Sequence, residues 1–214
     1  MKIKSFVFNR NQTNTYVVSD KESHEAIVID CGCSSQKEFE RLTRYVDEES
    51  INVKFCICTH LHYDHMYGTS YINDRFGLKT LASLKDEYNL EWNKMSAIFM
   101  ALDSNERNLL NYNSFIWIEK FHPQLSIGND YFQILETPGH SEGSISLYCR
   151  SKKIIFSGDV LFEQGYGRTD FEGGNLDTLR KSIQILLTHP RNVTIFPGHG
   201  KPFKIEERLR TYRM

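Results

Sequence analysis

The sequence predicts an α/β protein in which two mixed sheets pack face to face with helices outside, a four-layer αββα sandwich. Two observations lead to this fold class. Several short apolar runs have the β-branched and aromatic content of buried strands, and helix-like stretches follow strands in both halves of the chain. The 214 residues, of which 40% are hydrophobic, are enough to bury a sizeable core.

Five apolar runs are predicted to be buried strands: AIVI (26–29), FCIC (55–58), FQIL (132–135), KIIF (153–156) and VTIF (193–196). A short polar or glycine-containing segment follows each run. We therefore expect these segments to gather at one edge of the sheets, where loops commonly carry functional sites.

Two stretches are predicted to be helices. Residues 34–49 begin with a serine that can cap a helix, and Phe39, Leu42 and Val46 follow at helical spacing. Residues 175–189 repeat this pattern. These stretches are the expected outer layers of the sandwich.

Residues at about 84–120 contain no glycine and are rich in Leu, Met, Trp and Asn. We predict a mostly helical insertion within a single domain that spans residues 1–214. The insertion can form a wall of a substrate site, or its apolar residues can simply pack it onto the sandwich. The candidates for the wall are Trp92, Met95, Phe99 and Met100.

The charge of the chain indicates which kinds of binding partner are expected. With 26 basic and 27 acidic residues the formal net charge is −1, which argues against binding to nucleic acid or to a membrane surface. We expect a small-molecule substrate, and the oligomeric state stays open. The start of the chain lacks a long apolar region, and five cysteines are an odd number, so we expect reduced thiols and a cytoplasmic location.

The stretch THLHYDHMYG (59–68) places three histidines and an aspartate within six residues. Side chains at i and i+2 of an extended segment point the same way, so His60 and His62 can bind one ion. Asp64 and His65 follow where the strand is expected to turn into a helix, and they can reach a neighbouring position. The spacing suits two metal ions better than the alternative, a cluster of surface or hydrogen-bonded core histidines.

Three further polar residues follow predicted strands. His140 lies in TPGHSEGS, Asp159 in FSGDVLF and His199 in FPGHG. Each motif alone is weak, because Gly-His and Gly-Asp pairs are common in turns, but all of them in this order form a specific pattern. The sequence gives no role to the remaining histidines, His24, His122 and His189.

With these motifs, the Asn14–Tyr16 segment and the IDCG turn, the chain resembles the metallo-β-lactamase-fold hydrolases, most closely their glyoxalase II-like branch. The resemblance implies two Zn²⁺ ions, with Fe or Mn as other candidates. It assigns His60, His62 and His140 to one ion, Asp64, His65 and His199 to the second, and Asp159 as the bridge. True β-lactamases lack the bridging aspartate, so Asp159 argues against antibiotic hydrolysis.

The charges of such a centre account for hydrolysis. Two Zn²⁺ supply +4, and Asp64, Asp159 and a bridging hydroxide leave about +1 to stabilise an oxyanion. The hydroxide is available near neutral pH because metal binding lowers the pKa of water from 15.7 to about 7, and it can attack a carbonyl carbon. Asp64 is the predicted catalytic residue, since it can also orient the nucleophile.

The segment LFEQGYGRTDF is the predicted substrate-binding region. Gly165 and Gly167 flank Tyr166, so the backbone can approach the site closely. In glyoxalase II a basic residue at about the position of Arg168 binds glutathione, and a guanidinium group pairs well with a carboxylate. We assign substrate binding to Arg168 and Tyr166, with a structural brace between Arg168 and Asp170 as the alternative.

The resulting hypothesis is a binuclear metal-dependent hydrolase of thioesters, similar to hydroxyacylglutathione hydrolase. One alternative is a mononuclear iron persulfide dioxygenase, which would leave Asp64, His65 and His199 without metal. A less favoured one is a non-catalytic metal-binding domain. Only 14 residues follow Gly200, so we expect no counterpart of the C-terminal helical domain of glyoxalase II, which leaves specificity for S-lactoylglutathione open.

Overall fold

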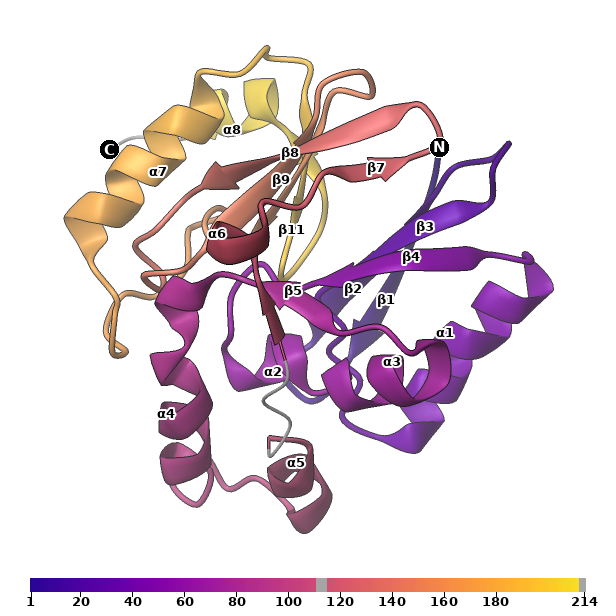
Figure 1. The fold of residues 1–214 in the computed structure, drawn as a ribbon. Coiled ribbons are helices and arrows are strands. Elements are labelled where there is room, and N and C mark those ends of the chain that lie inside the picture. Colours follow the sequence, from indigo (N-terminus) through magenta and orange to yellow (C-terminus); the bar gives the residue numbers. More distant parts are fainter. Residues whose placement is uncertain (111–114, 212–214) are drawn as a thin grey trace.

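The structure, a computed structural model that describes residues 1–110 and 115–211, confirms the predicted αββα sandwich (Figure 1). The described strands form two six-stranded sheets, in the orders β1-β2-β3-β4-β5-β6 and β12-β11-β10-β9-β8-β7. Both sheets are mixed. In the first, the pairs from β3 to β6 are parallel and the others antiparallel, whereas in the second β10 and β11 form the parallel pair.

The first sheet contains two of the predicted strands. The runs AIVI and FCIC correspond to β3 and β4, although Cys58 lies just beyond β4. Strands β1 and β2 were not predicted. Polar residues alternate with apolar ones in β1 and occupy both ends of β2, so neither contains a long apolar run. The strands are β1 (Lys2–Phe8), β2 (Thr13–Ser19), β3 (Glu25–Ile29), β4 (Asn52–Ile57), β5 (Thr80–Ala82) and β6 (Phe115–Trp117).

The second sheet contains the other three predicted strands. The runs FQIL, KIIF and VTIF correspond to β8, β10 and β11, and β9 lies between β8 and β10 without having been predicted. The strands are β7 (Leu125–Ile127), β8 (Asp130–Glu136), β9 (Ile145–Cys149), β10 (Ile154–Gly158), β11 (Thr194–Pro197) and β12 (Phe203–Lys204).

Helices cover the outer faces of both sheets (Figure 1). Helix α1 starts after Ser35, whose side chain accepts a hydrogen bond from the Glu38 amide, and it buries Phe39, Leu42 and Val46. Together with α3 it packs on the first sheet, and α7 packs on the second. The helices outside the insertion are α1 (Gln36–Glu48), α2 (Tyr63–Met66), α3 (Thr69–Phe76), α7 (Leu176–Leu187) and α8 (Ile205–Thr211). No described helix is long and apolar enough to cross a membrane.

The main core lies between the two sheets. Ile27, Ile57 and Tyr16 from the first sheet pack against Phe132 and Phe156 from the second. Each such fully buried side chain stabilises the fold by roughly 1.5–3 kcal/mol. The interface between the sheets is therefore the rigid base on which the loops at its edge are held.

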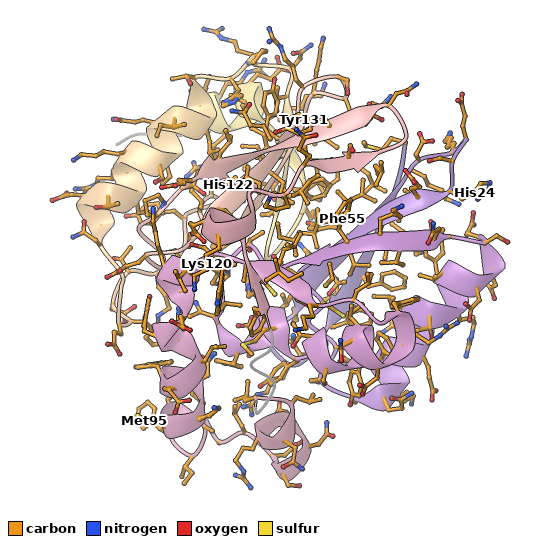
Figure 2. The ribbon with its side chains drawn as sticks, in the orientation of Figure 1. His24, Phe55, Met95, Lys120, His122 and Tyr131 are labelled. Carbon is orange, nitrogen blue, oxygen red and sulfur yellow. The ribbon has the colours of Figure 1, made fainter. Side chains whose placement is uncertain are left out.

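The segment 84–120 forms a lobe and also extends the first sheet. Helices α4 and α5 project beyond the sandwich (Figure 1), and Met95 on α4 lies at the outer margin of the molecule (Figure 2). Strand β6 pairs with β5 in parallel, and residues 111–114 of the segment lie outside the described residues. The helices of the segment are η1 (Leu84–Asp86), α4 (Tyr88–Ser96), α5 (Ser104–Leu109) and α6 (Ile118–Phe121).

The carboxylate of Asp86, at the end of η1, is fully buried and joins two loops of the molecule. Its oxygens accept hydrogen bonds from the Leu61 amide (2.9 Å), the Gly143 amide (2.6 Å) and the Ser141 hydroxyl (2.9 Å). Burial raises the pKa of Asp86, and these hydrogen bonds lower it. The segment after β4 is thus tied to the segment after β8 through one side chain.

We predict that Asp86→Ala lowers the free energy of unfolding by about 3 kcal/mol, because it leaves the buried Leu61 and Gly143 amides without an acceptor. Urea denaturation of the metal-free protein measures this change. Glu87→Ala, at the exposed neighbouring position, serves as the control and should stay within about 0.5 kcal/mol of the original protein. Equal stabilities of the two variants would contradict the role given to Asp86.

Candidate metal centre

All seven predicted ligands come together where the loops of the two sheets meet. Potential ligand atoms lie within 4.8 Å of one another in each of three overlapping groups. The groups are His60, His62 and His140; His60, His65 and Asp159; and Asp64, His65 and His199. The loops after β4, β8, β10 and β11 supply these side chains together with α2.

The local structure of HLHYDH follows the expected change from strand to helix. His60 and His62 come after β4, and their rings lie 4.7 Å apart between centroids. His62 is the extended residue that begins α2, so Asp64 and His65 lie on the helix and reach a second position. His62 Nδ1 lies 2.9 Å from His140 Nε2, which completes the first group.

The Asp159 carboxylate lies between the two sets of histidines. Its Oδ2 atom is 3.6 Å from His140 Nε2 and 3.4 Å from His199 Nε2, and its Oδ1 atom is 3.5 Å from His65 Nε2. A side chain at Gly198 would place a Cβ 2.1 Å from Asp159 Oδ1, so only glycine lets the two loops approach this closely. This is the placement that a bridging ligand needs.

Three ligand histidines are oriented through their second ring nitrogen. In each ring an acceptor faces Nδ1, so Nδ1 donates its hydrogen there and Nε2 is directed into the site, where its lone pair would bind a metal ion. The acceptors are Asp30 Oδ2 for His65 (3.1 Å), the Arg168 carbonyl for His140 (2.7 Å) and the Gln12 carbonyl for His199 (3.3 Å).

Asp30 is a site residue that sequence reasoning missed. Its carboxylate accepts hydrogen bonds from the Thr59 amide (2.7 Å) and hydroxyl (2.8 Å), and the same hydroxyl lies 3.1 Å from His60 Nδ1. Asp30 therefore orients both His60 and His65. The available signal was its place directly after the buried run AIVI, and its φ of 53° is uncommon for a residue other than glycine.

The Asp64 carboxylate is also held from the first sheet. The Thr13 hydroxyl donates to Asp64 Oδ2 at 2.7 Å, and His199 Nε2 lies 3.4 Å from the same oxygen. Thr13 in turn forms an isolated bridge with His199 through the backbone. Two of the three residues of the second group, Asp64 and His199, are thereby held by the start of β2.

In the metal-free chain, two histidines of the first group, His60 and His62, are held in the form that binds a cation. Burial, strengthened by neighbouring histidines, lowers the pKa of His60 well below its ordinary value and that of His62 to about 3. Neutral imidazoles are the form that ligates metal.

Around the second group, protons on two histidines balance the negative charges of the carboxylates. Burial alone would raise the pKa of Asp64 and Asp159, but His65 and His199 keep both pKa values below the ordinary range. Burial opposes protonation of the two histidines, yet the carboxylates raise the pKa of His65 well above its ordinary value and that of His199 to about 10. A bound cation would replace these protons.

Unpaired buried atoms support a cation at this position. His60 Nε2, His62 Nε2 and Asp159 Oδ1 are buried without a hydrogen-bond partner. Buried polar atoms are rarely left unpaired. Imidazole and carboxylate donors together suit Zn, Fe or Mn, so the residues fit a divalent metal.

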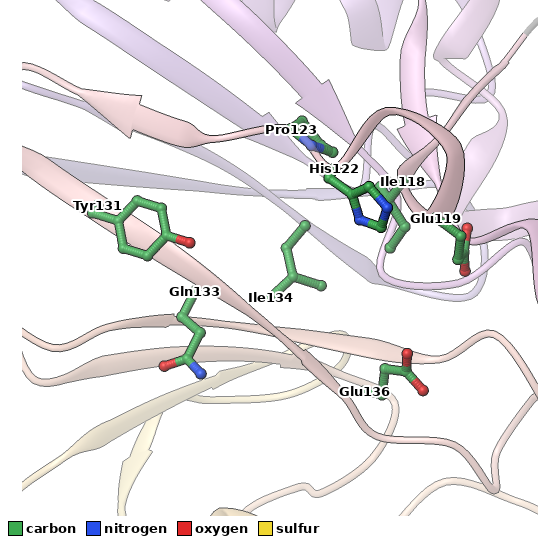
Figure 3. A pocket seen from close by; sticks show the side chains of 8 residues that line it. All are labelled: Ile118, Glu119, His122, Pro123, Tyr131, Gln133, Ile134 and Glu136. Carbon is green, nitrogen blue, oxygen red and sulfur yellow. The ribbon is translucent and has the colours of Figure 1, made fainter.

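The centre opens into a cavity of about 160 Å³. Its lining contains five of the predicted ligands, His62, Asp64, His140, Asp159 and His199, together with Asn11, Tyr63, Trp92, Arg168 and Phe171. A separate pocket of about 300 Å³ lies between α6 and β8 (Figure 3), and none of the seven ligands lines it.

The two predicted substrate-binding residues differ in position. Arg168 lines the cavity, but its Nε and Nη2 atoms each donate to Asp170 at 2.7 Å and its guanidinium lies 3.8 Å from the centre of the Phe171 ring. Tyr166 is 43% exposed and is not among the lining residues. The geometry of Arg168 is that of the brace considered as an alternative.

We predict that Asp30→Asn weakens metal binding about 10- to 100-fold, because an acceptor that orients His60 and His65 is lost. Competition with a chromogenic chelator measures the affinity. Asp74→Asn, at an exposed position, is the matched control and should leave affinity unchanged. Unaltered affinity in Asp30→Asn would show that its contacts do not orient the ligands.

Comparison with known proteins gives matches over nearly the whole chain. Hydroxyacylglutathione hydrolase GloC of Haemophilus influenzae is 31% identical over 99% of this chain and 96% of its own length. The probable metallo-hydrolase YqgX of Bacillus subtilis is 30% identical over 88% and 85%. The crystal structure of BLEG-1 B3 metallo-beta-lactamase superposes with a TM-score of 0.81 at 28% identity, covering 98% of this chain and 97% of that one.

A family model agrees with these relatives. The model of the metallo-beta-lactamase superfamily matches residues 8–199. This range contains strands β2 to β11 and all seven candidate residues of the metal centre. The chain therefore belongs to the metallo-beta-lactamase superfamily.

Proposed function

We propose that the protein is a metal-dependent hydrolase that cleaves thioesters with two divalent metal ions, most simply zinc. The observation that carries this proposal is the Asp159 carboxylate, whose two oxygens face histidines of both metal groups. A single tetrahedral ion has no use for seven ligands. Two ions that share one carboxylate use all of them.

The donors divide between two positions. His60, His62 and His140 would hold one ion, and Asp64, His65 and His199 the other. When bound, the two ions would supply a Lewis acid and a water of lowered pKa. Asp64, held by Thr13, would keep a fixed carboxylate beside the reacting water and orient it.

The cavity supports attack by water. Among the described residues that line it, none is a serine or cysteine that could serve as a nucleophile. The five cysteines are all buried, and burial raises the pKa of the Cys33, Cys56 and Cys58 thiols. The relative named hydroxyacylglutathione hydrolase supports a thioester as the substrate.

The alternative, a mononuclear iron persulfide dioxygenase, agrees less well with the site. It requires one ion with three protein ligands and open positions for oxygen and sulfur. The group formed by Asp64, His65 and His199 would then have no role, although its potential ligand atoms lie as close together as those of the first group.

We predict that the metal-depleted protein takes up two zinc ions per chain and then cleaves an acyl thioester without oxygen, because hydrolysis requires no redox change. Metal analysis and release of thiol under anaerobic conditions measure the two quantities. A β-lactam serves as a comparison substrate and should react poorly. One ion per chain, together with oxygen uptake by the iron-loaded protein on glutathione persulfide, would favour the dioxygenase instead.

We also predict that Asp64→Asn lowers kcat by about 10²- to 10⁴-fold, because the amide loses charge and one acceptor beside the reacting water. The melting temperature of the same metal-loaded sample should fall by only a few degrees. Asp74→Asn controls for the change of charge at an exposed site. Turnover equal to that of the control would remove Asp64 from the reaction.

A further inference from the structure

A larger cleft continues outward from the metal centre. Its volume is about 420 Å³, within the range of small-molecule sites. It shares five lining residues with the metal-site cavity, namely Asn11, Tyr63, Trp92, Arg168 and Phe171, and adds Arg10, Phe99 and Met100. A substrate held at the metals can therefore extend into the cleft towards α4.

The rings of Phe171 and Trp92 line both the metal-site cavity and the cleft. The Phe171 ring lies edge-on to the ligand His62 at 5.8 Å and contacts Trp92 at 5.0 Å, both measured between ring centroids. Phe99 and Met100 line the cleft but not the metal-site cavity. These side chains thus present apolar surface in the cavity and in the cleft.

Both guanidinium groups of the cleft already have partners. Arg10 donates to the carbonyls of Met100 (2.7 Å) and Ala101 (3.1 Å), and its Nε atom lies 3.7 Å from Glu106. Arg168 is paired with Asp170 through two hydrogen bonds. These cations brace the walls, so the described part of the cleft offers no unpaired arginine to a substrate carboxylate.

The lobe around the cleft exposes apolar side chains. Met95, Ile98 and Phe99 are 82%, 80% and 92% exposed, and Met95 stands at the margin of the molecule (Figure 2). Of the three, Phe99 lines the cleft, which connects this surface to the metal centre.

From these contacts we propose that the cleft binds the apolar acyl chain of the substrate, so that the enzyme prefers thioesters of medium-length aliphatic acids over short or hydroxylated acyl groups. This inference rests on the proposed thioester hydrolase function. In the reaction, water forms the new C–O bond, the C–S bond breaks, and a proton from water ends on the released thiol. The acyl chain remains in the cleft as part of the carboxylic acid.

The first test varies the acyl group alone. Acetyl, lactoyl, butanoyl and octanoyl thioesters of N-acetylcysteamine share one small neutral thiol. We expect kcat/KM to rise on the order of a hundred-fold from acetyl to octanoyl, because each buried methylene adds binding energy. The lactoyl thioester should resemble the acetyl one. Equal values across the series would overturn the inference while leaving a hydrolase in place.

A matched pair of variants locates the effect. Phe99→Ser removes an apolar side chain that lines the cleft, and Ile98→Ser removes an equally exposed neighbour that does not. The ratio of kcat/KM for octanoyl to that for acetyl should fall about ten-fold in Phe99→Ser and stay at its original value in Ile98→Ser. The same ratio in both variants would contradict the assignment.

Binding of the product separates this inference from the proposed function. Octanoate should quench the fluorescence of Trp92 in the zinc-loaded protein at far lower concentration than acetate does, and Trp92→Phe should abolish the response. If no thioester is cleaved but octanoate binds in this way, the function fails and the cleft assignment stands. If octanoate binds no more tightly than acetate, the assignment is wrong. A preference for glutathione thioesters that disappears in Arg168→Met would also overturn it.

Discussion

The orientation of the histidines in the metal centre depends on hydrogen bonds to the Asp30 carboxylate. This carboxylate is buried at the end of β3, accepts from Thr59 and His65, and reaches His60 through the Thr59 hydroxyl. His60 and His65 belong to different metal groups. One carboxylate therefore orients one ring in each of the two candidate metal groups. A buried charge is stable here because each of its oxygens has a donor.

Other hydrogen bonds hold the second sheet close to the Asp30 carboxylate and the metal centre. The Tyr16 hydroxyl and the Asn14 side chain donate to the carbonyl of Pro197, at 2.7 and 3.0 Å, and so fasten β2 to the loop that carries His199. Asp86 joins the loops after β4 and β8 in a similar way. The site thus lies at the seam between the sheets, where neither sheet alone holds a complete set of ligands.

The candidate metal ligands and the cleft beside them come from different parts of the chain. The ligands lie on the sandwich, whose loops are fixed by buried hydrogen bonds. Residues of α4 and of the segment around Phe171 line the cleft. Its two arginines, Arg10 and Arg168, form hydrogen bonds with other residues of the protein. If the cleft binds the acyl chain as proposed, a change in the lobe would alter which acyl group fits without moving the candidate metal ligands. This separation is common where a rigid scaffold carries variable loops.

The sequence by itself determined the fold class, five strands and two outer helices, because these rest on local spacing, and it proposed seven metal ligands that the structure brings together. Apolar runs mark buried strands, and the positions of His60, His62, Asp64 and His65 fix side-chain directions within a few residues. Only the tertiary structure identified Asp30 as an orienting residue, paired Arg168 with Asp170, and placed the Gln12 carbonyl beside His199, 187 positions along the chain. It also supplied β1, β2 and β9, whose mixed polarity gives no clear run. Hydrogen-bond partners depend on how two sheets pack, and most of them lie too far apart in the chain for local spacing to reveal them.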